Sequence, residues 1–299
     1  MGIKTKLKDL VRKVFLVSGM TGELKQEMRN SQISQKLLQL HYQTNLSQKL
    51  PLPKISEAGW RVFSQTDEDG ILHYIFSLIG ITNKVCLDIA FASPYGANTT
   101  NLILNNGWTG LLICGNERES QNAKEFFKSH PDTAAFPLIV FHQWITAENV
   151  NETVKEGLSQ LYIDVGGGID LFSLDIDGAD YWVWKALEVV KPRVVVAEYQ
   201  DIWGEKSVTI PYKPDFCRYD IHPDYCSASL PALVKLAKEK GYRLIGCNRL
   251  GYNAFFIKNG VGEKIFPEIT VKECLVHPKV ISGQKNRLPA VKKYKWVEI

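Results

Sequence analysis

The sequence predicts an α/β protein in which a mostly parallel sheet is wrapped by helices. From Trp60 onward, short apolar segments typical of strands alternate with amphipathic segments typical of helices. The strand segments are continuously apolar, as in a sheet that is covered on both faces. The last two are separated only by residues 248–253, which predicts an antiparallel hairpin. We therefore expect a Rossmann-like, doubly wound, mostly parallel sheet with an antiparallel closing hairpin.

The predicted elements begin and end at recognisable signals. Asp67, Glu68 and Asp69 place negative charge at the N-terminus of a helix that reaches Ile79, and Gly107 closes a helix over 99–106. Further helices are expected at 120–128, 149–158, 181–189 and 229–240. Strands are expected at 85–89, 110–113, 138–141, 170–175, 194–199, 242–247 and 254–257.

The two ends of the chain lie outside this alternation. Residues 1–54 predict a helical, basic N-terminal extension, with a second helical stretch over 32–48. A basic amphipathic helix within residues 1–17 fits contact with an anionic membrane surface, packing on its own domain, or formation of a homo-oligomer. The sheet domain is expected over 55–260. Residues 261–299 are expected to form a tail packed on that domain, irregular and rich in lysine.

The composition excludes some classes of protein. Apolar residues make up 45% and charged residues 23% of the chain, as in ordinary globular proteins. The net charge of +4 is mild and basic residues do not interleave with aromatic ones, so nucleic acid is not an expected partner. The six cysteines form no C-x-x-C pair, and no signal peptide or membrane-spanning apolar run is found. We expect reduced thiols and a cytoplasmic protein.

Two carboxylates end one of the predicted strands. In Leu171-Phe-Ser-Leu-Asp-Ile-Asp-Gly178 an apolar strand leads into Asp175 and Asp177, and alternation predicts that both lie on one side of the strand. Ligands bind at this edge of an open α/β sheet. Two neighbouring buried carboxylates are costly unless a cation, a donor-rich ligand or a catalytic proton offsets the cost. A functional site is therefore favoured, with capping of the next helix as the alternative.

The turn after the first strand is where a doubly wound fold holds a nucleotide-like cofactor. Asp88 lies in that strand, but Ala90 and Ala92 occupy positions where glycines are expected. The next strand ends at Cys114, where an acid that binds ribose is expected. The predicted cofactor-binding residues are Asp88, Ala90, Ala92, Asn98, Cys114, Gly115, Asn116 and Glu117. A glycine run at 166–168 precedes a strand rather than a helix, which favours a simple connection.

Several motifs occur in a fixed order along the chain. They include Ser64-Gln-Thr-Asp-Glu-Asp-Gly-Ile71, Gly107-Trp-Thr-Gly-Leu-Leu112, Ser173-Leu-Asp-Ile-Asp-Gly178 and Ser207-Val-Thr-Ile-Pro-Tyr212. Between about Ser64 and Lys258 the chain resembles FkbM-like, class I S-adenosylmethionine-dependent methyltransferases, most closely a bacterial branch of them. Relatives carry a glycine-rich turn after Asp88 and an aspartate in place of Cys114, so this chain has a degenerate cofactor loop.

The resemblance implies that S-adenosylmethionine is the cofactor and that a hydroxyl group on a glycan or small metabolite is methylated. A hydroxyl acceptor needs a general base or a metal ion, which Asp175 and Asp177 can provide together with Glu198. Glu198 has the alternative of pairing with Arg193 or Arg218. The acceptor side is expected to contain Tyr181, Trp182, Tyr212 and His222.

Two other functions stay open. One is an inactive methyltransferase-fold protein that serves as a binding or scaffold module. The other is a glycosyltransferase that binds a divalent metal through Asp175-Ile-Asp177.

Overall fold

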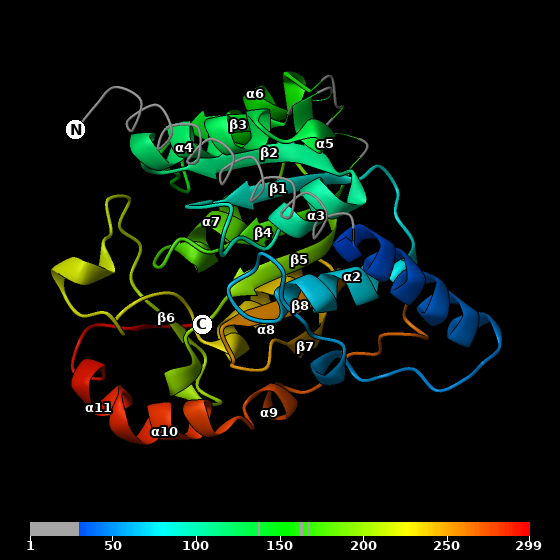
Figure 1. Cartoon of the computed structure of the whole chain (residues 1–299). Helices are drawn as coiled ribbons and strands as arrows, with labels where there is room; N and C mark the ends of the chain where they lie inside the picture. The colour runs from blue at the N-terminus through cyan, green and yellow to red at the C-terminus, as the bar shows by residue number, and fades with distance from the viewer. Residues whose placement is uncertain (1–29, 135, 137, 162–163, 165, 167) are drawn as a thin grey trace, which may run out of the picture.

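The computed structural model describes residues 30–134, 136, 138–161, 164, 166 and 168–299 (Figure 1). The predicted basic helix within residues 1–17 lies outside the described residues. The glycine run at 166–168 lies partly outside them, because residue 167 is not described.

The described chain forms a seven-stranded sheet in the order β3-β2-β1-β4-β5-β8-β7 (Figure 1). Its strands are β1 (Val85–Ile89), β2 (Thr109–Cys114), β3 (Ile139–His142), β4 (Ile169–Leu174), β5 (Pro192–Glu198), β7 (Tyr242–Cys247) and β8 (Asn253–Lys258). The first five strands pair in parallel, whereas β8 is antiparallel to both β5 and β7. The predicted Rossmann-like sheet with an antiparallel closing hairpin is confirmed.

Helices cover both faces of the sheet. They include α2 (Glu68–Ile79), α3 (Thr100–Asn106), α4 (Glu117–Lys128), α6 (Val150–Ser159), α7 (Asp180–Ala186) and α8 (Leu230–Glu239). Helices α2, α3 and α4 pack with a helix over 30–47 on one face, and α6, α7 and α8 pack on the other. Alternation divides each strand between the two layers: Leu87 and Ile89 face one, and Cys86 faces the other.

The predicted second helical stretch is confirmed as the helix over 30–47. Tyr42 on this helix packs edge-to-face against Tyr74 of α2, with ring centroids 4.8 Å apart. The amide of Gln35 donates a 2.8 Å hydrogen bond to Asn101 Oδ1 in α3. Within the described part of the chain, no helix is long and apolar enough to cross a membrane.

Residues 262–299 are not irregular, and that prediction is wrong. They contain α9 (Val271–Cys274), α10 (Pro278–Asn286), α11 (Leu288–Val291) and strand β9 (Val297–Glu298). The signals are local: Thr270 and Glu273 form a capping box before α9, and Pro278 occupies the first turn of α10 after the cap at His277. We also did not predict the single-turn helix α5 (Pro131–Ala134).

A third, smaller core lies beside the carboxyl edge of the sheet. It joins the long connection after β5, which contains η3 (Asp201–Trp203), β6 (Val208–Thr209) and η4 (Arg218–Asp220), to the C-terminal helices. Strand β6 pairs with β9, so residues near the end of the sequence stabilise the position of the connection after β5. Ile202 and Ile210 pack with Val291 of α11, and all three are fully buried. The connection is thereby held against the edge where ligands bind.

Candidate active site

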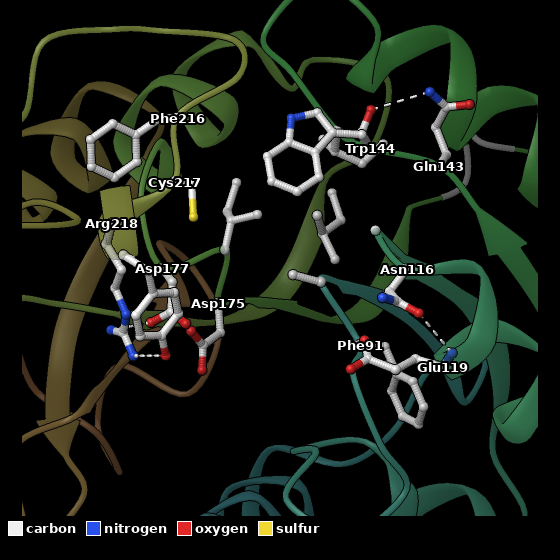
Figure 2. Close-up of a pocket in the computed structure, with 16 residues that line it drawn as sticks. Phe91, Asn116, Glu119, Gln143, Trp144, Asp175, Asp177, Phe216, Cys217 and Arg218 are labelled. Atoms are coloured by element: carbon white, nitrogen blue, oxygen red, sulfur yellow. Dashed lines mark hydrogen bonds and ion pairs between the residues drawn. The ribbon is translucent and has the colours of Figure 1, made fainter. Parts of the chain in front are cut away.

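Three cavities meet at Asp175, which borders all of them. The β1 cavity, of 300 Å³, lies over the end of β1 and is lined by Asp88, Ala90, Asn98 and Ser173 among others. The aromatic cavity, of 390 Å³, is lined by Phe91, Trp144 and Phe216 together with Asn116, Glu119 and Arg218 (Figure 2). The polar cavity, of 360 Å³, is lined by Glu198, Gln200, Ser227, Lys279 and Arg287 among others.

The turn after β1 keeps a glycine-type backbone although it contains no glycine at its start. Ala90 has a φ of 70°, in the left-handed region that alanine seldom adopts. The amides of Ala90 and Phe91 both donate 3.0 Å hydrogen bonds to the carbonyl of Ile113 in the neighbouring strand. These bonds hold the turn open above the β1 cavity. The left-handed backbone conformation of the turn is therefore kept although alanine replaces the expected glycine.

Asp88 points from β1 toward the start of α3. Its Oδ2 accepts a 2.6 Å hydrogen bond from Thr99 Oγ1, and next to it the Asn98 amide donates a 3.1 Å bond to Ser173 Oγ. Burial raises the pKa of Asp88 to about 7. The carboxyl group therefore titrates near neutral pH within reach of a ligand in the β1 cavity.

The end of β2 offers a different acid from the one we predicted. Cys114 is fully buried, and Asn116 Oδ1 caps α4 by accepting from the amides of Arg118 and Glu119. Glu117 is exposed and does not line any of the three cavities, whereas Glu119, two residues later in the first turn of α4, lines the aromatic cavity. An N-cap asparagine followed three residues later by glutamate is a recognisable helix start, and this signal could have pointed to Glu119.

Gly115 is held close to the ring of Trp144. A Cβ on Gly115 would lie 3.2 Å from that ring, so a larger residue would require the indole to shift. Trp144 is half exposed, and its indole nitrogen donates a 2.7 Å hydrogen bond to the carbonyl of Pro214. This hydrogen bond joins the connection after β5 to Trp144, which lines the aromatic cavity.

Three carboxylates converge between β4 and β5. Single oxygens of Asp175, Asp177 and Glu198 all lie within 4.8 Å of one another. The predicted route to this arrangement, alternation along one strand, is wrong. Strand β4 ends at Leu174, and Asp177 lies in a turn with a φ of 56° that carries its carboxylate back toward Asp175. Glu198 joins them because β5 is the parallel neighbour of β4.

Buried Asp180 holds this turn together. Its carboxylate accepts hydrogen bonds from the amides of Ile176 and Gly178, at 2.8 and 3.0 Å, and from Ser227 Oγ at 2.9 Å. The turn therefore depends on a residue of the connection after β5, Ser227, as well as on its own sequence.

Arg218 supplies positive charge at the acid cluster, which is formed by Asp175, Asp177 and Glu198. Its guanidinium forms an ion pair with Asp177, and Figure 2 shows the two side chains on the opposite side of the aromatic cavity from Asn116 and Glu119. The alternative in which Glu198 pairs with an arginine is wrong, because Arg193 binds Asp170 at 2.9 Å and Arg218 binds Asp177. Glu198 Oε2 is buried without a hydrogen-bond partner among the described residues.

The electrostatics of the cluster keep protons on it. Burial, with repulsion from Asp177 and Asp180, raises the pKa of Asp175 to about 7. Burial and repulsion from Asp175 also raise the pKa of Glu198 well above its usual value. Burial raises the pKa of Asp177 as well, although Arg218 opposes this shift. Raised pKa values in neighbouring carboxylates are common at sites of acid–base catalysis.

The residues predicted for the acceptor side do not line these cavities. Tyr181 is buried in the core, and Trp182 donates a 2.9 Å hydrogen bond to the carbonyl of Ile210. The hydroxyl of Tyr212 bonds to Glu148 and to the amide of Ala147. His222 Nδ1 accepts from the amide of Asp224 at 3.1 Å and stays on the loop. The polar cavity is lined instead by Arg218, Lys279 and Arg287. Contacts between segments distant in sequence bring them there, so no local sequence pattern predicts them.

No protein-family model and no curated protein matches the chain. Among solved structures, the chain is similar to the magnesium protoporphyrin IX methyltransferase of Synechocystis PCC 6803, with 10% identity and a TM-score of 0.39 over 64% of this chain and 78% of that one. It is similar to an O-methyltransferase family protein of Burkholderia thailandensis, with 11% identity and a TM-score of 0.38 over 78% and 72%. A SAM-dependent methyltransferase of Methanosarcina mazei gives 13% identity and a TM-score of 0.34 over 58% and 90%. These likenesses concern the fold and assign no activity.

Proposed function

We propose that the protein is an S-adenosylmethionine-dependent methyltransferase that acts on a hydroxyl group of a glycan or small metabolite. The observation that carries the proposal is the meeting of three cavities at Asp175. A cofactor above the ends of β1 and β2 and an acceptor beside Glu198 would face each other across the acid cluster, as in-line transfer requires.

The residues over β1 and β2 fit this cofactor. Asp88 and Asn98 line the β1 cavity, and the left-handed turn at Ala90 leaves it open. Asn116 and Glu119 line the aromatic cavity, where Glu119 offers the carboxylate that Cys114 cannot. Carboxylates bind the hydroxyl groups of a ribose in folds of this kind. When bound, S-adenosylmethionine supplies an activated methyl group.

The acid cluster would manage the acceptor's proton. A hydroxyl group that gains a methyl group must lose its proton, and a carboxylate with a pKa near 7 is suited to take it. Asp175 has such a pKa, and Glu198 has a free buried oxygen beside it. The ion pair with Arg218 keeps Asp177 in place and limits the repulsion within the cluster.

The same cluster also fits a divalent cation. Three carboxylate oxygens within 4.8 Å of one another match the oxygen ligands that Mg²⁺ and Ca²⁺ prefer. A cation there would serve the hydroxyl group by lowering its pKa, in place of a protein base. This fit to a divalent cation also supports the alternative that Asp175 and Asp177 belong to a metal-dependent glycosyltransferase.

An inactive binding module is the alternative that a specific observation favours. Cys114 replaces the expected ribose-binding acid and is fully buried, and Ala90 strains the turn that a glycine would adopt freely. This alternative keeps the cavities but expects no methyl transfer.

Transfer of label from S-adenosylmethionine carrying a radioactive methyl group tests the proposal. The acceptors are the small-molecule and polysaccharide fractions of a bacterial extract. We expect labelled product with the wild-type protein and at least about a hundredfold less with Asp175→Asn, because the proton acceptor is lost. Circular dichroism confirms that the variant is folded. Equal labelling by both proteins would overturn the role of Asp175.

A further inference from the structure

We infer that the polar cavity is the acceptor subsite and that it selects an uncharged, polyhydroxylated group over an anionic one. The inference rests on the proposed function. The cavity lies on the side of the acid cluster away from Asn116 and Glu119, and Asp175, Asp177 and Glu198 all border it. A ligand in it would therefore reach the cluster without entering the space over β2.

Opposite the acid cluster, the wall of the cavity comes from segments outside the parallel strands. Gln200 and Asp201 follow β5, Asp224 comes late in the same connection, and Lys279 and Arg287 come from α10 and the residue that follows it. Lys279 also lies over the ring of Tyr252, with its ammonium group 3.9 Å from the ring centroid. The C-terminal segment is thereby part of the site and not only of the core.

Every basic side chain that lines the cavity is already paired. Lys279 binds Asp201 at 2.8 Å, and Arg287 binds the other oxygen of Asp201 at 3.1 Å. Arg287 also binds Asp224, through two hydrogen bonds to Oδ1. With Arg218 held by Asp177, each of the three cations faces a carboxylate. Among the described residues, a phosphate or carboxylate group would find no free positive charge here and would meet the acid cluster, which disfavours an anionic ligand.

The unsatisfied polar atoms at the cavity suit hydroxyl groups. Among the described residues, Glu198 Oε2 and Arg218 Nε are buried without a hydrogen-bond partner. Both residues border the cavity. Buried polar atoms are normally paired, so these point to a ligand that supplies the partners. A hydroxyl group both donates and accepts, and several of them on one ring match this mixture of atoms.

Asp224 and Asp201 would then act as specificity-determining residues. They neutralise Lys279 and Arg287, and neither belongs to the acid cluster. Removing the charge of Asp224 leaves Arg287 with only the shared Asp201 and so creates an excess of positive charge beside the cavity. Such a variant should accept an anionic sugar that the wild-type protein rejects.

Saturation-transfer NMR tests the inference on the full chain. The probes are methyl glycosides of glucose, galactose, mannose and rhamnose, with glucuronate and glucose 6-phosphate as charged counterparts. We expect at least one neutral glycoside to bind wild-type protein at least about tenfold more tightly than both charged sugars. In Asp224→Asn, glucuronate binding should rise at least about fivefold, a gain of about 1 kcal/mol. The matched control is Asp215→Asn, an exposed aspartate outside the cavity.

Absence of binding by every neutral glycoside, or tighter binding of the charged sugars, would overturn the inference. Equal glucuronate affinity in the two aspartate variants would overturn the role of Asp224. Calorimetry with S-adenosylhomocysteine on the same samples separates this inference from the proposed function. Glycoside binding without S-adenosylhomocysteine binding keeps the subsite and removes the methyltransferase. The reverse result removes the subsite alone.

Discussion

Thr99 Oγ1 donates a 2.6 Å hydrogen bond to Asp88 Oδ2, which ties the end of β1 to the start of α3. The bond favours the charged carboxylate, yet burial outweighs it and raises the pKa of Asp88 to about 7. The folded protein therefore holds a proton on Asp88 at a pH where the unfolded chain has lost it.

This shift predicts how stability depends on pH. A raised carboxyl pKa does not lower the free energy of unfolding below about pH 4, where the group is protonated in both states. The loss of stability then grows as the pH rises to about 7. Asp88→Asn removes this cost, so the stability of the variant relative to the wild type should rise by about 2.5 kcal/mol from pH 5 to pH 8. Urea unfolding at each pH measures the difference, with Asp215→Asn as the control. A difference that does not change with pH would contradict the assigned pKa.

The turn at Ala90 predicts a stabilising substitution. Alanine with a φ of 70° is strained, whereas glycine adopts this conformation freely. Ala90→Gly should raise the free energy of unfolding by up to about 1 kcal/mol, after the greater flexibility of glycine in the unfolded chain is deducted. Ala92→Gly is the control, because Ala92 lies in the same turn but is not among the residues with positive φ. A loss of stability in Ala90→Gly would show that the turn is not strained.

Glu119 is predicted to hold the cofactor, and Glu117 is not. Glu119→Gln should weaken binding of S-adenosylhomocysteine about tenfold, the usual effect of losing a hydrogen bond to a charged group. Glu117→Gln is the matched control, two residues away on the same helix and exposed. Calorimetric titration gives both affinities. Equal weakening by the two substitutions would remove Glu119 from the site.

The cation proposal has a separate test. Mn²⁺ bound at the acid cluster would enhance the relaxation of water protons, and Glu198→Gln should abolish the enhancement by removing one of three ligands. Glu148→Gln serves as the control, because Glu148 bonds Tyr212 outside the cluster. If wild-type protein shows no enhancement, the cluster works through protons alone.

Much of the fold could be predicted because its signals are local. Continuous apolar strands, the glycine after α3 and the charges before α2 each act within a few residues, and the closing hairpin followed from two neighbouring strands. The capping box at Thr270 and Glu273 is equally local and marks the start of α9, the first of the C-terminal helices, which we did not predict.

The site was harder to predict because it depends on contacts distant in sequence. Asp175 and Asp177 were recognised from their own motif, although a turn and not a strand brings them together. Arg218 reaches them only because the third core holds the connection after β5 against the sheet. Aromatic residues near the motif, such as Tyr181, fill the core instead. The aromatic residues next to the motif in sequence therefore do not line the cavities that meet at Asp175.

The most direct test of the central claim is calorimetric titration of the wild-type protein with S-adenosylhomocysteine. Binding with a dissociation constant in the low micromolar range, about −8 kcal/mol, is the result we predict. It would show that the strained turn at Ala90 and the carboxylate of Glu119 still form a cofactor site. No detectable binding to a well-folded sample would contradict the claim and favour the inactive binding module.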